Sequence, residues 1–289
     1  MSRPVEVGRL YRRRLLRCSL LFIFLLSGVL WPAQAAAPQR IISMTPHITE
    51  QLFAIGAGSQ VIGIDDASDW PLDVNRLPRV AHYQSINTER LLALHPDLVI
   101  LWDGSQRLLQ TQLQQLGVPV VMLHSQQLTD LAPNLRQLGA LTGHSAQAEA
   151  LARQMEQRLQ ALQRQYQSKP PVRLFFQLWQ PPLTTIARGG WVQEAVELCG
   201  GDNPFAHSIT AYPQVDIEQV IRSAPQLIVT VQNADALTPW QQWPMLPAVQ
   251  HHQLKTLSPD RLQRLTPRIL DGIDELCRVI DGTRTTSTH

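Results

Sequence analysis

Two tyrosines and two glutamates recur at matching places in the two halves of the sequence. Tyr83 meets Tyr212 and Glu89 meets Glu218 at a constant offset of 129 residues, within two stretches that align without a gap. The common order of helix, turn and strand explains part of this match, but it does not require the shared tyrosine and glutamate. The two halves are therefore predicted to be structural repeats.

The paired tyrosines are candidate ligand-binding residues. Tyr83 and Tyr212 each precede a predicted helix, on the loop side of their half. Tyrosine combines a flat apolar face with a polar tip, and a facing pair suits a large, flat, partly polar ligand. The alternative is that both are surface tyrosines that pack on their own loops.

The paired glutamates are candidate docking residues. Glu89 and Glu218 both fall in the first turn of a predicted helix, where the helix dipole alone already favours a carboxylate. A matched exposed acid on each half would also suit a pair of arginines on a two-fold symmetric partner, through charge-assisted hydrogen bonds.

Further candidates lie where predicted strands end. Trp102 and Trp179 stand at such ends, where loops begin and pockets form, although either can equally be a core residue. A polar loop precedes the last predicted helix and could reach amide or phosphate groups of a ligand, or be an ordinary solvated turn. Its residues are Asp260, Arg261, Leu262, Gln263 and Arg264.

The sequence offers little support for an enzyme or a metal protein. It contains no G-x-S-x-G nucleophile motif, no phosphate-binding loop and no C-x-x-C pair. His251 and His252 are adjacent, so their rings would point to different sides of an element. The carboxylates around Asp65 are more typical of a solvated loop than of a cation site. No catalytic residue, metal site or cofactor is therefore predicted.

Strands alternate with helices along most of the chain, which favours parallel sheets covered by helices. Strands are expected at 41–44, 61–64, 98–102, 118–123, 172–178 and 227–231. A weaker echo of the repeat pairs Glu50 with Glu194, and Gly56 with Gly200, at an offset of 144 residues.

One long helix is predicted between the two halves, over 145–167. Its apolar residues recur at three-and-four spacing, and Lys169-Pro170-Pro171 ends it. The expected fold is α/β: two similar lobes with parallel sheets, joined by this helix, with a ligand cleft between them. A helical connection predicts only a small hinge closure.

The N-terminus reads as an export signal, with a basic region, an apolar run and a small-residue cleavage site at Ala33-Gln34-Ala35. Without residues 1–35 the chain keeps 19 basic and 22 acidic residues, a net charge of −3. No basic patch then remains to indicate nucleic-acid binding. The expected organisation is a signal peptide (1–35), an N-terminal lobe (36–143), a backbone helix (144–169), a C-terminal lobe (170–282) and a flexible tail (283–289).

Two cysteines, Cys199 and Cys277, follow the signal. An even number in an exported protein suggests a disulfide. Two buried free thiols are the alternative.

The order of motifs resembles the periplasmic cobalamin-binding proteins of bacterial ABC importers, in a group that also binds siderophores and haem. The resemblance covers nearly the whole chain after the signal. It rests on RIISMTPHITEQLFAIGAG, ASDWP, INTERLLALHPDLVILW, VELCGGDNPFA, AYPQVDIEQVIRSAPQLIV and TPRI.

The resemblance implies roles for the candidate residues. Aromatic residues at Tyr83 and Tyr212 would line the cleft, the loop 260–264 would touch cobalamin, and the two cysteines would form a disulfide. Glu89 and Glu218 would meet arginines of a two-fold symmetric inner-membrane permease that works with ATPase subunits.

Two positions depart from the family pattern. Ala67 stands where relatives can have a ligand-contacting tyrosine, and Arg261 stands where an aromatic residue can occur. The resemblance implies a periplasmic protein, monomeric when free, that carries cobalamin as a transported ligand. A siderophore or haem receptor of the same fold and an exported enzyme are the alternatives.

Overall fold

The computed structural model describes residues 36–82, 85–103 and 106–286. The expected signal peptide and Tyr83 lie outside these residues. Residues 37–289 group into one compact unit. Within its described part, no helix is both long and apolar enough to cross a membrane.

The first sheet has the strand order β4-β3-β2-β1-β5-β6. Its strands are parallel except for β4, which is antiparallel to β3. The strands are β1 (Ile41–Ser43), β2 (Val61–Asp65), β3 (Arg79–His82), β4 (Ser85–Ile86), β5 (Leu98–Trp102) and β6 (Val120–Leu123). Its helices are α2 (Pro46–Ala54), α3 (Thr88–Ala93), α4 (Arg107–Gln115) and α5 (Leu131–Thr142), with 3-10 turns at η1 (Ala57–Gln60), η2 (Leu72–Arg76) and η3 (Leu128–Asp130).

The second sheet has the order β10-β9-β7-β8, and its pairs are all parallel. The strands are β7 (Val172–Gln177), β8 (Gly201–Asp202), β9 (Leu227–Thr230) and β10 (Leu254–Thr256). Its helices are α7 (Trp191–Leu198), α8 (Ile217–Ser223), α9 (Pro247–Gln250), α10 (Pro259–Leu262) and α11 (Ile269–Thr286), with a 3-10 segment η4 (Ala234–Gln242). The two sheets confirm the predicted pair of α/β lobes.

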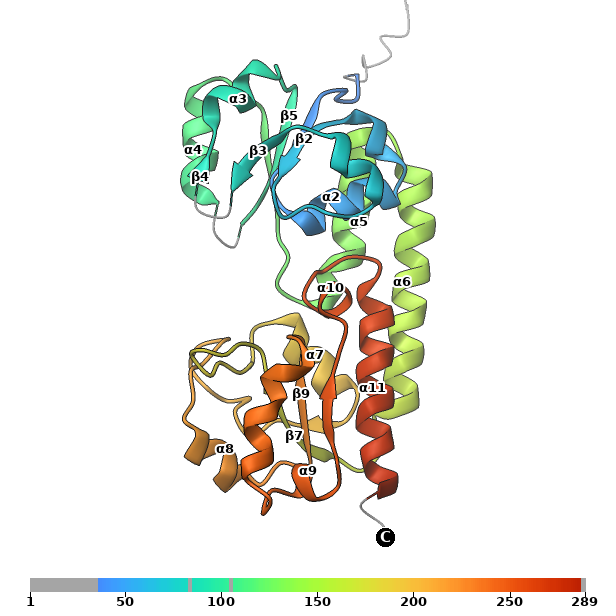
Figure 1. The fold of residues 1–289 in the computed structure, drawn as a ribbon. Helices are drawn as coiled ribbons and strands as arrows, with labels where there is room; N and C mark the ends of the chain where they lie inside the picture. The colour runs from blue at the N-terminus through green and yellow to red at the C-terminus, as the bar shows by residue number, and fades with distance from the viewer. Residues whose placement is uncertain (1–35, 83–84, 104–105, 287–289) are drawn as a thin grey trace, which may run out of the picture. The chain divides into compact units, whose positions relative to one another are not determined.

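The predicted long helix is α6 (Ser145–Tyr166). It packs along α5 of the first lobe and along α7 and α11 of the second (Figure 1). Its buried side chains include Ala148, Ala152 and Met155. A Cβ on Gly139 would lie 2.3 Å from the Cβ of Ala148, so glycine permits the close approach of α5 and α6. The helix therefore joins the lobes through packed apolar contacts.

The C-terminal end differs from the expected flexible tail. Helix α11 continues to Thr286, and Thr283 is only 1% exposed. Arg284 donates to the carbonyl oxygens of Pro170 (2.7 Å) and Cys199 (2.9 Å). Residues 283–286 of the expected tail therefore belong to α11, because these polar residues have partners on the lobe that their sequence neighbours do not reveal; residues 287–289 lie outside the described part.

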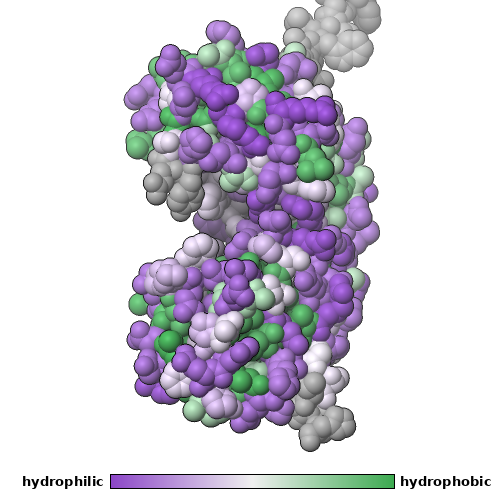
Figure 2. All heavy atoms as spheres, in the orientation of Figure 1, coloured by the Kyte–Doolittle hydropathy of each residue, from purple (hydrophilic) through white to green (hydrophobic). Residues whose placement is uncertain are grey.

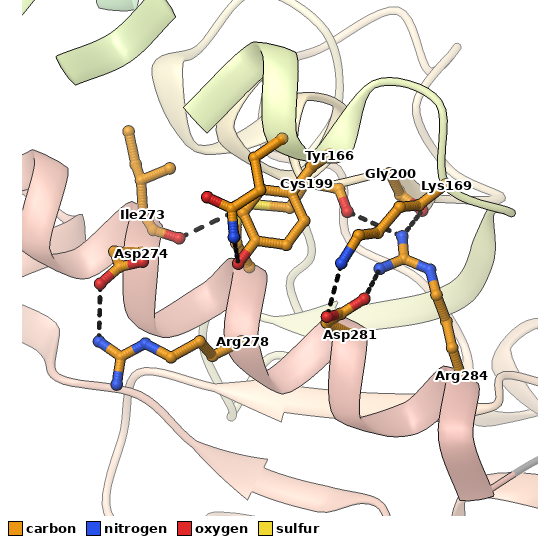
Figure 3. Close-up of a disulfide and its surroundings, with 11 residues drawn as sticks. Tyr166, Lys169, Cys199, Gly200, Ile273, Asp274, Arg278, Asp281 and Arg284 are labelled. Atoms are coloured by element: carbon orange, nitrogen blue, oxygen red, sulfur yellow. Dashed lines mark hydrogen bonds and ion pairs between the residues drawn. A yellow bond between two sulfur atoms is a disulfide. The ribbon is translucent and has the colours of Figure 1, made fainter. Parts of the chain in front are cut away.

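A disulfide joins Cys199 to Cys277, with Cα atoms 4.7 Å apart. Both residues are buried, Cys199 at the end of α7 and Cys277 inside α11. Figure 3 shows the bond beside the Arg284 side chain, which also reaches the carbonyl of Gly200 (3.4 Å). The covalent link therefore fixes α7 against α11, as the family resemblance implies.

Candidate ligand-binding site

The parallel strands of the first sheet bring Ala67 and Trp102 to the same edge. Ala67 follows β2 and is exposed, and Trp102 ends β5 and is half-buried. In parallel α/β sheets, ligands bind outside the carboxyl ends of the strands. Gln106 fixes this edge, because its Oε1 accepts from Trp102 N (2.9 Å) and its Nε2 donates to Met44 O (3.1 Å).

A buried histidine supports the Trp102 ring. His47 opens α2 and packs on Trp102 edge-to-face, with ring centroids 5.8 Å apart. Burial, and then the charge of Arg264, lower the pKa of His47 to about 4. The imidazole is therefore neutral at physiological pH.

The second lobe presents two exposed aromatic rings. Trp179 follows β7 and is 56% exposed, and Tyr212 is 50% exposed. The backbone of Thr184 forms isolated antiparallel β-bridges with Trp179 and with Gln214. The two rings therefore come from backbone segments that flank the same extended segment. The Tyr212 hydroxyl lies against Gly190, where a Cβ would approach it to 3.3 Å, and partial burial raises the pKa of Tyr212.

The polar loop divides into exposed and buried residues. Asp260, Arg261 and Gln263 are exposed. Leu262 is fully buried, and its carbonyl accepts from Trp191 Nε1 (3.1 Å). The Leu262 side chain therefore packs in the core and offers no surface to a ligand, contrary to the sequence expectation. Leucine at the end of a short helix turns inward because burial of its side chain is favourable.

Arg264 is bound by carboxylates of the first lobe. Its Nη1 lies 3.2 Å from Glu50 Oε1, and its guanidinium also pairs with Asp69. The hydrogen bond from Arg264 is the main cause of a lowered pKa of Asp69. Asp69 follows β2 and Arg264 follows β10, so the carboxyl-end loops of the two sheets face each other.

The other contacts of this junction come from Gln51, Leu265 and Arg268. Arg268 donates from Nε to Glu50 Oε2 and from Nη2 to Glu50 Oε1, both at 2.8 Å. Gln51 Nε2 donates to Leu265 O at 2.7 Å. We call this set, Glu50 and Gln51 with Arg264, Leu265 and Arg268, the α2 junction. The surface is hollowed between the two lobes (Figure 2).

The two glutamates occupy equivalent places on their lobes. Glu89 lies in the first turn of α3 and Glu218 in the first turn of α8, and both are exposed. Asn87 caps α3 by accepting from Arg90 N, and Asp216 caps α8. Within the described residues neither glutamate has an ion-pair partner, so both carboxylates are available to another molecule.

The carboxylates of the loop after β2 have partners within the protein. Asp65 accepts from Ser68 and from Ala67 N, Asp66 pairs with His82, and Asp69 pairs with Arg264. Among the described residues no group of three or more histidines, cysteines or carboxylates could hold a metal ion.

Sequence reasoning missed the roles of His47, Glu50 and Arg268. The available signal was the echo that pairs Glu50 with Glu194, because a carboxylate repeated at the same place before a glycine in both halves suggests a shared role. Nothing in the local sequence identifies that partner, which lies 214 residues away in Arg264.

Comparison with known proteins identifies the class. Residues 41–261 match the model of the family described as periplasmic binding protein. A vitamin B12-binding protein of Vibrio cholerae serotype O1 is 39% identical over 91% of this chain and 95% of its own length. The crystal structure of the periplasmic vitamin B12 binding protein BtuF of Vibrio cholerae superposes with a TM-score of 0.80, covering 86% of this chain and 98% of that one.

A second solved structure, the periplasmic heme binding protein HutB of Vibrio cholerae, is 25% identical with a TM-score of 0.73, over 83% of this chain and 98% of that one. Such proteins are binding proteins rather than enzymes. The chain belongs to the periplasmic binding protein family.

Proposed function

We propose that this protein captures cobalamin in the periplasm and delivers it to an ABC importer of the inner membrane. The observation that carries the proposal is the 39% identity to a vitamin B12-binding protein, which extends over 91% of the chain and so includes both lobes. Cobalamin is the transported ligand, and no cofactor is required.

The chemistry of the site supports a corrinoid. Trp179 and Tyr212 offer exposed aromatic faces, which suit a large, flat, partly polar ligand. In the first lobe, Trp102 lies at the end of β5. The exposed Asp260 and Gln263 supply hydrogen-bonding groups for the amides of a corrinoid. Ala67, after β2, has a small and exposed side chain.

The haem and siderophore alternatives are less well supported. A haem receptor needs a tyrosine or histidine as iron ligand. In the described part of the site, His47 is buried behind Trp102, which leaves the half-exposed Tyr212 as a candidate iron ligand. An anionic siderophore needs several free arginines, but Arg264 is held by Glu50 and Asp69.

Calorimetric titration tests this proposal. Purified protein without residues 1–35 is titrated with cyanocobalamin, with haemin and with a ferric siderophore. We expect one cyanocobalamin per monomer and much weaker binding of the other two ligands. Saturable binding of haemin or siderophore without any corrinoid binding would replace the proposed function by the corresponding alternative.

We further propose that Glu89 and Glu218 dock on a two-fold symmetric permease, which works with its ATPase subunits. The support is their equivalent position in the first turns of α3 and α8 and their exposure. Two matched carboxylates suit two symmetry-related arginines. The protein itself is proposed to be a monomer when free.

A double charge reversal, Glu89→Lys with Glu218→Lys, tests the docking. Corrinoid affinity should stay unchanged, because neither residue lies at the carboxyl edge of a sheet, while stimulation of the importer ATPase should be lost. Unchanged stimulation in the double variant would remove the docking role. Arg90→Ala with Arg222→Ala, which alters neighbouring charges on the same helices, is the matched control.

A further inference from the structure

Helices α2 and α7 are equivalent elements of the two lobes. Each is followed by a glycine in the left-handed region, Gly56 with φ 90° and Gly200 with φ 76°. Each carries a carboxylate six residues before that glycine, Glu50 on α2 and Glu194 on α7. The offset of 144 residues that pairs them in the sequence therefore corresponds to a structural equivalence.

Both carboxylates cross to the opposite lobe. Glu50 belongs to the first lobe and accepts from Arg264 and Arg268 of the second. Glu194 belongs to the second lobe and accepts from the backbone N–H of Leu128 in the first, at 2.8 Å. We call Glu194 and Leu128 the α7 junction.

The α2 junction holds the end of the polar loop. Arg264 follows Gln263 directly, and Leu265 and Arg268 come next, so the attachments to Glu50 and Gln51 begin where the exposed loop ends. Arg268 also stacks on the Trp70 ring of the first lobe, with its Cζ 4.7 Å from the ring centroid. The loop therefore leaves the second lobe and is anchored on the first.

The other contacts of the loop are to its own lobe. Trp191 Nε1 on α7 donates to Leu262 O. Gly272 in the first turn of α11 lies so close to Arg261 that a Cβ would approach its carbonyl oxygen to 2.7 Å. The loop is thus held by α7 and α11 on one side, and on the other side Gln51 holds the backbone of Leu265 while Glu50 holds the side chains of Arg264 and Arg268.

We propose that Glu50 is a positioning residue for ligand binding: it fixes the loop Asp260–Gln263 at the cleft without touching the ligand. The identity of the ligand rests on the proposed function. The attachment of the loop by Glu50 does not depend on it. Glu50 is only 4% exposed, and a residue whose own geometry is fixed by burial and hydrogen bonds can orient its neighbours accurately.

The Glu50 carboxylate is essential to this role because Arg264 and Arg268 differ in the other partners that they have. Arg264 keeps Asp69 when Glu50 is removed. Within the described residues, both side-chain hydrogen bonds of Arg268 end on Glu50, and its guanidinium also stacks on the Trp70 ring. Loss of the carboxylate therefore removes both hydrogen bonds from the Arg268 side chain and loosens the segment that follows the loop, which Gln51 and Asp69 still hold at Leu265 and Arg264.

The test combines hydrogen exchange with calorimetry on two variants. Glu50→Gln removes the charge, and Arg268→Lys keeps the charge but loses the two-pronged bond to Glu50. We expect faster amide exchange over 260–266 in both variants and a Kd for cyanocobalamin raised about tenfold, at an unchanged number of sites. A mere loss of folded protein would instead reduce the number of sites.

Glu156→Gln is the matched control, because Glu156 also binds an arginine, Arg136, but lies outside both junctions. It should leave exchange and affinity unchanged. If Glu50→Gln does not fold, Arg268→Lys decides. Unchanged exchange over 260–266 in the folded variants would overturn the positioning role, as would an affinity equal to that of the control. If the unmodified protein binds no corrinoid, the proposed function fails, and the exchange result still decides the role of Glu50.

Discussion

The α2 junction and the α7 junction occupy equivalent places in the two lobes but differ in chemistry. Glu50 is nearly inaccessible to solvent and accepts from two arginines. Glu194 is half-buried and accepts from one backbone N–H. Burial, and then the charges of Asp130 and Glu197, raise the pKa of Glu194, while the hydrogen bond from Leu128 opposes that shift.

The difference shows how two copies of one element can take unequal roles. Charge-assisted hydrogen bonds from arginine are roughly twice as strong as neutral ones and fix orientation as well as distance. Glu194 accepts one backbone hydrogen bond, and burial destabilises its charged form. Its attachment is therefore weaker than that of Glu50. We therefore expect any opening between the lobes to release the α7 junction first and to leave the α2 junction intact.

The largest effect is expected from Glu50→Ala. Removing one partner of a buried ion pair leaves uncompensated charge, which costs about 3–5 kcal/mol of unfolding free energy. Urea unfolding followed by circular dichroism measures this loss. A loss under about 1 kcal/mol would mean that the α2 junction is no stronger than a surface ion pair.

The next largest effect is expected when both cysteines, Cys199 and Cys277, are changed to alanine. The disulfide closes a separation of 78 residues and holds α7, which carries Glu194, against α11. Its loss should cost about 2–5 kcal/mol of unfolding free energy. Hydrogen exchange should become faster around Leu128 and stay unchanged at Leu265. Equal acceleration at both places would contradict independent junctions.

A smaller and pH-dependent effect is expected from Glu194→Gln. Because its pKa is raised in the folded protein, Glu194 binds a proton more tightly there than in the unfolded chain. The resulting stabilisation is complete below a pH of about 4.5, the ordinary value, and is lost as the pH rises through the raised pKa. Glutamine keeps a neutral acceptor for Leu128 at every pH.

The variant Glu194→Gln should therefore change stability at pH 7 by less than about 1 kcal/mol and should lack this part of the pH dependence. Urea midpoints between pH 4 and pH 7 provide the comparison. A large destabilisation at pH 7, of the size expected for Glu50→Ala, would show that the two junctions are equally strong.

The smallest effect is expected from Glu156→Gln, outside both junctions. Arg136 keeps its bonds to Glu149 when Glu156 loses its charge, and exposed ion pairs contribute little to stability. The thermal midpoint should not change measurably. A clear shift would indicate that surface pairs along α6 contribute to the spacing of the lobes.

Much of the fold follows from local sequence patterns. The three-and-four spacing of apolar residues predicts α6. Asn87 and Asp216 cap the repeated helices α3 and α8, as expected for polar residues that precede a helix. Strands β3 and β10 were not predicted, because His82 and Lys255 interrupt short segments that only pairing with β2 and β9 makes extended.

The site is less predictable, because its residues act through contacts distant in the sequence. Trp179 and Tyr212 are identifiable as exposed rings at strand ends and repeat positions. Whether Arg264 faces a ligand or a carboxylate depends on Glu50, which no local pattern connects to it. The burial of Leu262 is likewise not predictable from its polar neighbours, because it depends on the packing of α7 and α11 around the loop.

A crystal structure of the protein with bound cyanocobalamin would show directly whether the ligand lies between the two lobes. We expect one corrin ring between the lobes, in contact with Trp102 on one side and with Trp179 or Tyr212 on the other. The loop 260–263 should touch its amide side chains, and Glu50 should remain bound to Arg268. A corrin held by one lobe alone, or lying against the α3 and α8 surfaces of Glu89 and Glu218, would contradict it.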